Sequence, residues 1–354
     1  MAFFRSNKPR GLVGLDIGSS SVKAVELGKK GNGYELANLG LDPLSQDTIV
    51  DGAIMDAPSV SSAIGKVFAD SGIQNSNVAA AVSGHSVIVK RITVPALNQE
   101  ELEQAIQQEA QQHIRFDLAD VNLTYYPLGG AGAGSAVDVL LLAAKREKME
   151  SHANVVALAN KTLMVLDIDA FALQNAFEVN YEPAADLTVA LLNIGASSMN
   201  INITRGGAPL FTRDVSVGGN QYTDILQKEL DLSFEDAEKL KMGGKISTVK
   251  PGTEEAHLRS VSELLLLEIQ KTFDFFKQTN PNDHIGALYL SGGTAQVKGL
   301  VELLNEDFRV PVEILNPFRK ISFNSSRFDP DFIAAIAPRM TVSVGLALRS
   351  FDEA

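Results

Sequence analysis

The residues best suited to chemistry lie in two short stretches that share one arrangement of small and polar side chains. The first, residues 14–23, reads GLDIGSSSVK, and the second, residues 191–200, reads LLNIGASSMN. In this alignment Asp16 falls on Asn193, and Gly18 falls on Gly195. Each copy has an apolar entry, a turn of small residues and an alternating exit, and this order predicts a β-hairpin.

The chemistry that such turns suit is the binding of phosphate. A glycine-rich turn exposes backbone N–H groups with no side chain in the way, so phosphate oxygens can approach closely. One turn of this kind is weak evidence, because most small-residue turns only connect two strands. Two copies separated by half the chain predict two similar domains that each present a hairpin to one ligand.

Length and composition set further bounds. At 354 residues the chain is long enough for two domains, and its formal net charge of −12 argues against a nucleic-acid partner. It has no cysteine, which excludes disulfides and thiolate sites, and its five histidines show no metal-ligand spacing. The apolar runs are far shorter than the roughly 20 residues of a membrane span.

Periodic apolar residues predict the elements that position the two hairpins. One helix is expected to begin at Pro58 and to end at Gly72, and another to follow a capping box formed by Asn98 and Glu101. A buried strand at 287–290 leads into the turn Ser-Gly-Gly-Thr at 291–294. The remaining predicted helices lie at residues 145–159, 169–179, 221–242, 254–278 and 338–349.

Three other patterns bear on ligand binding. The Gly-Lys pairs at 28–29, 65–66 and 244–245 lack a following hydroxyl, which excludes a Walker-type phosphate loop. The glycines within residues 130–134 imitate a dinucleotide fingerprint, but they lead into a strand, so we interpret them as a hairpin loop. For Glu238 and Lys241, three residues apart on one helix face, a solvent-exposed charge pair is the default interpretation and joint ligand binding the alternative.

Together these elements resemble the actin-like ATPase superfamily over essentially the whole chain. Residues 15–20 and 192–197 resemble its two phosphate motifs, 290–295 its adenosine motif, and the helices at 169 and at Gly345 its connecting helices. The segment 86–162 lies where the division protein FtsA carries an extra subdomain. Residues 108–120, QEAQQHIRFDLAD, are similar to the PilM family of type IV pilus assembly proteins. The chain ends directly after the second connecting helix, which also favours PilM over FtsA.

The resemblance implies an α/β actin-like ATPase fold, in which two duplicated domains surround a nucleotide cleft and an FtsA-type subdomain is inserted. Core subdomain 1A is expected at 1–85, completed by 163–185 and 338–354, and the inserted subdomain 1C at 86–162. Subdomain 2A is expected at 186–225 and 285–337, and subdomain 2B at 226–284.

The resemblance also implies ATP or ADP as the ligand, together with Mg²⁺. Asp16 is expected to hold Mg²⁺, Asp169 to position the attacking water, and Asn193 to be a weak third catalytic candidate. The residues implied in nucleotide binding are Gly18, Ser19, Ser20, Ser21, Lys23, Gly195, Ala196, Ser197, Ser198, Gly218, Gly219, Asn220, Glu238, Lys241, Gly292, Gly293, Thr294 and Gly345.

One position departs from the pattern of the superfamily. The second phosphate motif usually begins with Asp, and this chain has Asn193 there. An amide cannot supply the carboxylate charge that activates a metal or a water, and phosphoryl transfer depends on such positioning and electrostatics. We therefore predict ATP binding with slow or absent hydrolysis.

The leading functional hypothesis is a cytoplasmic adaptor recruited to the inner face of the inner membrane, with only indirect membrane contact. It would bind the N-terminal cytoplasmic tail of a PilN-like membrane protein in a groove between subdomain 1A and the insertion. The strand 87–94 and the helix 100–114 are candidate walls of that groove. Other pilus platform proteins and a second copy of the chain are further candidate partners. The alternatives are a small-molecule kinase and a filament-forming ATPase like FtsA or actin.

Overall fold

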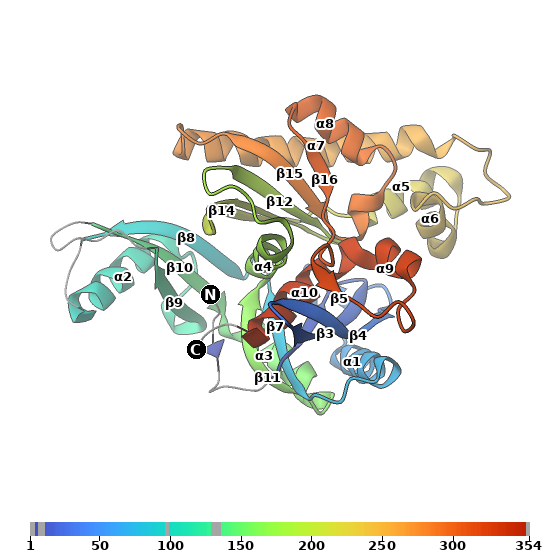
Figure 1. The fold of residues 1–354 in the computed structure, drawn as a ribbon. Coiled ribbons are helices and arrows are strands. Elements are labelled where there is room, and N and C mark those ends of the chain that lie inside the picture. Colours follow the sequence, from blue (N-terminus) through green and yellow to red (C-terminus); the bar gives the residue numbers. More distant parts are fainter. Residues whose placement is uncertain (1–3, 6–10, 96–98, 129–135, 352–354) are drawn as a thin grey trace.

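The computed structural model describes residues 4–5, 11–95, 99–128 and 136–351 (Figure 1). The strands are β1 Phe4–Arg5, β2 Val13–Ile17, β3 Ser21–Lys30, β4 Gly33–Pro43, β5 Ile49–Val50, β6 Ala53–Ile54, β7 Asn77–Val82, β8 Val87–Val94, β9 Val121–Pro127, β10 Val137–Lys145, β11 Thr162–Ile168, β12 Thr188–Ile194, β13 Met199–Arg205, β14 Ala208–Val215, β15 Ile285–Ser291, β16 Val312–Ile314 and β17 Ile321–Ser322. The helices are α1 Ala57–Ser71, α2 Gln99–His113, α3 Arg146–Leu158, α4 Asp169–Tyr181, α5 Asn220–Leu230, α6 Phe234–Lys241, α7 Glu254–Thr279, α8 Leu300–Phe308, α9 Pro330–Ile336 and α10 Thr341–Leu348, with 3-10 turns η1 Leu118–Asp120, η2 Gly293–Gln296, η3 Ala337–Met340 and η4 Arg349–Phe351.

Two large sheets repeat one topology. The first has the order β1-β11-β7-β2-β3-β4-β17, and the second has the order β14-β13-β12-β15-β16. In each sheet a hairpin and a third antiparallel strand form a meander, and two parallel strands extend it beside the first strand of the hairpin. Asp16 pairs with Lys23 across the first hairpin as Asn193 pairs with Asn200 across the second. The predicted duplication is therefore confirmed.

Helices α4 and α10 form the layer between the two sheets (Figure 1). Helix α10 packs on β2 and β3, while α4 packs on α10 and on β12 and β13. Helix α10 contacts both α4 and β2 closely, and each of these contacts is made at a glycine. A Cβ on Gly345 would lie 1.7 Å from the carbonyl oxygen of Ala172 in α4, and a Cβ on Gly14 in β2 would lie 1.9 Å from that of Ser343 in α10. The two sheets can therefore come this close only because these two residues lack a side chain.

The end of the chain forms one continuous helical stretch, from α9 through η3 and α10 to η4. By length and composition alone, Pro330–Phe351 is apolar enough to cross a membrane, but 72% of its apolar window is buried inside the protein. This burial identifies it as a core helix. At its end, Arg349 donates a 2.6 Å hydrogen bond to the fully buried carboxylate of Asp167 in β11, which ties the last helical turn to the first sheet.

The segment after β7 builds a separate three-stranded sheet in the order β8-β10-β9 (Figure 1, left). One face of β10 packs against α2, and the opposite face packs against β7, β11 and α4. Helix α3 also packs outside the inserted sheet, since its residues Val155 and Val156 lie in the core formed by α1 and the first sheet. Thus α3 joins the inserted sheet to the first domain, although we expected it within the insertion.

The apolar periodicity explains why most of the predicted helices form. In α1 the predicted apolar stripe is buried, and Gly72 closes the helix at φ +73°. The helical segments expected within 221–242 are two helices, because Asp231 adopts φ +51° and Ser233 caps a new helix by accepting a bond from the backbone N–H of Asp236. Asn98 and the loop at 129–135 lie outside the described residues. The elements α8, α9, β16 and β17 were not predicted.

We expect the substitution Gly345→Ala to destabilise the protein by about 1–3 kcal/mol, because a methyl group would force α10 away from α4. Urea denaturation followed by circular dichroism measures this change in the free energy of unfolding. Gly65→Ala is the matched control. It lies in the middle of α1, a Cβ there would meet nothing within 4 Å, and it should stabilise by about 0.5–1 kcal/mol. Equal effects at the two positions would contradict the packing role of Gly345.

Candidate functional site

A cleft of about 640 Å³ lies between the two domains, and both predicted hairpin turns line it. The turns have one geometry. The backbone N–H of Gly18 donates to the carbonyl oxygen of Ser21 at 3.1 Å, and that of Gly195 donates to Ser198 at 2.9 Å. They also meet across the cleft, where the hydroxyl of Ser197 donates to the hydroxyl of Ser19 at 2.9 Å. The two copies of the motif are thus brought together as the duplication predicted.

The first turn has features that suit an anionic ligand. Gly18, Ser19 and Ser20 line the cleft, where Gly18 and Ser19 are half-buried and Ser20 is exposed. The hydroxyl of Ser21 is buried and has no hydrogen-bond partner among the described residues. Buried polar atoms normally have a partner, so an ordered water would complete this hydroxyl, which lies behind the cleft lining. The glycine turn in front of it is the part of the site that a phosphate group fits.

The strands behind the two turns carry equivalent pairs with different charge. On the first hairpin Lys23 forms a 2.9 Å ion pair with Asp16, and both side chains are largely buried. On the second hairpin the amide of Asn193 donates to the side-chain oxygen of Asn200 at 2.9 Å. The positions predicted to correspond do so in the structure, with an ion pair replaced by a pair of amides.

The amide pair continues as a chain of hydrogen bonds. Asn200 donates to the carboxylate of Asp214 in β14 at 2.8 Å, and the other oxygen of Asp214 accepts a bond from the backbone N–H of Gly84. Gly84 has φ +87° and lies just before β8. Burial raises the pKa of Asp214, and the bond from Asn200 is the largest effect that lowers it. The second phosphate turn is thereby connected to the start of the inserted sheet.

Asp169 stands at the N-terminus of α4, on the cleft wall that belongs to the first domain. Burial, and after it the nearby Asp16 carboxylate, raise the pKa of Asp169 to about 7, although a hydrogen bond from Ser83 acts in the opposite direction. A carboxyl group with this pKa can accept and release a proton near neutral pH. This property suits the role in water positioning that the sequence implied.

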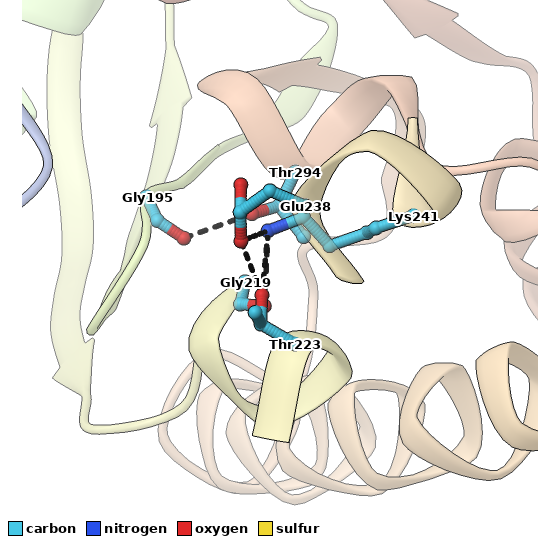
Figure 2. Close-up of polar contacts among 6 residues, drawn as sticks. All are labelled: Gly195, Gly219, Thr223, Glu238, Lys241 and Thr294. Carbon is cyan, nitrogen blue, oxygen red and sulfur yellow. Dashed lines mark hydrogen bonds and ion pairs between the residues drawn. The ribbon is translucent and has the colours of Figure 1, made fainter. Parts of the chain in front are cut away.

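The far end of the cleft contains a hydrogen-bonded cluster from the second domain, drawn in Figure 2. Lys241 in α6 is buried, forms an ion pair with Glu238, and donates to the hydroxyl of Thr223 at 3.0 Å and to the carbonyl oxygen of Gly219 at 3.3 Å. Thr223 also donates to Glu238. The default interpretation of Glu238 and Lys241 as a solvent-exposed pair is therefore wrong, since both line the cleft and Lys241 is buried.

Two of the predicted glycines pack closely against the backbone of the second hairpin. A Cβ on Gly218 would lie 2.7 Å from the carbonyl oxygens of Gly195 and Ala196, and a Cβ on Gly292, at φ +85°, would lie 2.2 Å from that of Ile194. The hydroxyl of Thr294 donates to the carbonyl oxygen of Gly195 at 2.9 Å. The predicted residues that line the cleft itself are Asp16, Gly18, Ser19, Ser20, Lys23, Asp169, Asn193, Gly195, Ala196, Ser197, Ser198, Asn220, Glu238, Lys241, Gly292, Gly293 and Thr294.

Four predicted residues lie outside this lining. Ser21 is buried in β3, and Gly218 and Gly219 pack behind the second turn. The prediction that Gly345 binds nucleotide is corrected, because Gly345 lies at the contact between α4 and α10 instead of at the ligand site. We expected it at the nucleotide because it lies in the second connecting helix, yet its lack of a side chain serves helix packing.

Among the cleft residues that were not predicted from the sequence, three are ionisable: Lys148 and His152 in α3, and Arg339 in η3. Burial lowers the pKa of His152 to about 4 and also lowers the pKa of Lys148 and of Arg339. The spacing of Lys148 and His152, four apart on one helix face, was the available signal. The helix that carries them was expected within the insertion.

The site does not form a protein cage for a metal ion. Among the described residues, no group of three or more His, Cys, Asp or Glu side chains could hold one, and Asp16 is engaged by Lys23. Mg²⁺ usually binds through one or two carboxylates together with phosphate oxygens and water. Asp16 fits this role only as part of a nucleotide complex.

Comparison with known proteins places these features in context. The family model described as type IV pilus assembly protein PilM matches residues 14–351. The structure "PilM-PilN type IV pilus biogenesis complex" is 27% identical with a TM-score of 0.87, covering 98% of this chain and 100% of that chain. MreB5 of Spiroplasma citri bound to ADP, 14% identical over 95% of this chain and 94% of that chain, has a TM-score of 0.52 and shows the fold alone.

Among curated proteins, the cell division protein FtsA of Helicobacter pylori (strain ATCC 700392 / 26695) is 24% identical over 247 residues. The match covers 63% of this chain and 49% of FtsA, so the chain spans about half the length of this relative. These likenesses, with the duplicated sheets, confirm the predicted actin-like α/β fold.

We expect Asp169→Asn to stabilise the protein at pH 8 by about 1–2 kcal/mol and to change its stability little at pH 5. The raised pKa means that the folded state binds more protons than the unfolded state between the ordinary pKa of Asp and about 7. The wild type therefore loses stability as the pH rises through this window, and the amide does not. Urea denaturation at both pH values measures the difference, with the exposed Asp70→Asn as control. An unchanged pH dependence in Asp169→Asn would contradict this assignment.

Proposed function

Because this chain belongs to the family of type IV pilus assembly protein PilM, we propose that it is a nucleotide-binding adaptor of the pilus assembly platform. In this role it binds the N-terminal cytoplasmic peptide of a PilN-like inner-membrane protein and hydrolyses ATP slowly or not at all. The observation that carries the proposal is the similarity, over 98% of this chain, to a structure of a PilM–PilN complex.

The proposed ligand of the cleft is ATP or ADP with Mg²⁺. Two glycine turns that face each other suit the phosphates, while Glu238, which Lys241 and Thr223 hold through one carboxylate oxygen, can offer its other oxygen to a ribose hydroxyl. The residues we assign to nucleotide binding are those of the sequence analysis without Gly345. A fold neighbour, MreB5, has been solved with ADP, which agrees with a nucleotide in this cleft.

Slow hydrolysis is proposed from the charge of the second hairpin. Asn193 accepts a 3.2 Å bond from the hydroxyl of Ser291 and donates to Asn200, so both functions of its amide are used inside the protein. It brings no negative charge to a metal-bound or attacking water. Asp169 then remains the proposed residue for positioning the water.

The peptide groove is proposed where the inserted sheet meets the first domain. Four apolar side chains there, Val87, Val89, Tyr126 and Leu128, are only partly buried against the core of β7, β11 and α4. Further burial of such side chains by a partner is favourable, at about 25 cal/mol for each Å² of apolar surface. In contrast, the apolar face of α2 is already covered by β10, which leaves the strand β8 as the better candidate wall.

The place of action follows from this partner. A protein that binds the cytoplasmic tail of an inner-membrane protein acts in the cytoplasm, at the inner face of that membrane. Contact with the membrane is then indirect. We propose no nucleic-acid partner, in agreement with the net charge of −12. Other platform proteins and a second copy of the chain remain proposed partners.

We expect a fluorescent peptide from the N-terminus of the PilN-like protein to bind with a dissociation constant in the micromolar range or tighter, about −8 kcal/mol. Fluorescence anisotropy measures binding with ATP–Mg²⁺, with ADP–Mg²⁺ and without nucleotide. Val89→Lys should weaken binding at least about tenfold, because an ammonium group would be placed in the apolar contact. Leu264→Lys, on an exposed position of α7, is the matched control. No saturable binding of the wild type in any nucleotide state would overturn the adaptor function.

We expect Asn193→Asp to raise the rate of phosphate release from ATP severalfold, since it adds the carboxylate that the second phosphate motif otherwise lacks. A coupled assay for inorganic phosphate with Mg²⁺ present measures this rate. The control is Asn305→Asp, the same chemical change on the exposed face of α8. If Asn193→Asp binds ATP and releases no more phosphate than the control, the missing charge is not the reason for slow turnover.

A further inference from the structure

Lys148 is the lysine of the cleft whose charge is left without a counterpart. Three lysines line the cleft: Lys23, Lys148 and Lys241. Lys23 is paired with Asp16, and Lys241 with Glu238. No carboxylate oxygen of the described residues lies within 4.0 Å of the ammonium group of Lys148, which donates to the carbonyl oxygen of Gly52.

The position of Lys148 is unfavourable for a cation. It lies in the first turn of α3, where the helix dipole opposes positive charge. It is half-buried, and burial is the largest effect on its pKa, which is lowered, although Asp169 and Asp214 act in the other direction. Holding a charge here costs free energy that an anion bound in the cleft would offset.

The charges near Lys148 indicate which kind of anion would bind to it. Asp169 is close enough to influence Lys148, and the Asp16 carboxylate influences Asp169 in turn. A polyphosphate that enters this part of the cleft meets these carboxylates, so a cation is needed beside them. Lys148 and Asp169 come from the first domain, whereas Glu238 and Lys241, at the proposed base side, come from the second.

Resting on the proposed function, we propose that Lys148 binds the terminal phosphate of ATP and makes the position of the inserted sheet depend on that phosphate. ADP lacks the group that Lys148 recognises. Lys148 is thus a residue for nucleotide specificity contributed by α3, outside both phosphate turns.

The connection between Lys148 and the inserted sheet is direct. Strand β10 ends at Lys145 and α3 begins at Arg146, with no loop between them. Strand β10 is the central strand of the sheet β8-β10-β9, and its register with β8 extends from Val137 to Ala144. A movement of the first turn of α3 toward the phosphate therefore moves the strand that carries the proposed peptide groove.

The test compares wild type, Lys148→Met, Lys148→Arg and the control Lys298→Met, whose side chain is exposed in another part of the fold. Isothermal titration calorimetry measures the affinities for ATP–Mg²⁺ and ADP–Mg²⁺. Hydrogen exchange of the β10 and α3 amides, with each nucleotide bound, reports the coupling. Thermal melting separates a loss of binding from a loss of folding, and Lys148→Gln replaces Lys148→Met if the latter does not fold.

In Lys148→Met we expect ATP binding to weaken about tenfold, ADP binding to change less than about twofold, and the ATP-specific protection of β10 and α3 to disappear. Lys148→Arg should keep most of the affinity for ATP, and the melting temperature should not fall. An equal loss for ATP and ADP, or no loss, would overturn the assignment to the terminal phosphate. If the wild type binds neither nucleotide, the proposed function itself fails, and this inference fails with it.

Discussion

The close approach of α10 to its two neighbours is the constraint on which the rest of the structure depends. At Gly14 the helix lies against β2, and at Gly345 it lies against α4, in each case with no room for a Cβ. Strand β2 leads directly into the first phosphate turn, and α4 begins at Asp169. The two glycines thus set how far apart the sheets lie, and with that spacing they set the width of the cleft in which both turns meet.

Within this frame the duplicated hairpins have diverged in charge and in the connections they make. Lys23 and Asp16 form an ion pair within the cleft. The amide of Asn193 instead begins a chain of hydrogen bonds that continues through Asn200 and Asp214 to Gly84. An aspartate at position 193 could not donate to Asn200. The presence of asparagine at position 193 therefore has a structural explanation, because its amide connects the second turn to the start of the inserted sheet.

Much of the fold, and the two phosphate turns of the candidate site, could be predicted from the sequence. The repeat of Asp16 and Gly18 at Asn193 and Gly195 was visible because it is local, and it led to the duplicated sheets. The stripe that forms α1 was visible for the same reason. Contacts between distant segments could not be predicted, since no local pattern reveals that Ala172 lies under Gly345, or that α3 packs on α1 and the first sheet. Helical segments were predicted within 221–242, but the position of the break between them, at Asp231 and Ser233, was not.

The placement of α3 supplies a physical connection for the proposed coupling between the two proposed sites. Its apolar face belongs to the core of the first domain, its first turn supplies Lys148 to the cleft, and the residue before it ends the central strand of the inserted sheet. Coupling between two sites is reciprocal in free energy. A partner that shifts the inserted sheet must therefore change the affinity for nucleotide by the same factor with which nucleotide changes the affinity for that partner. An adaptor with this architecture does not need hydrolysis to respond to its ligand, because exchange of one bound nucleotide for another is enough to shift the element that both sites share.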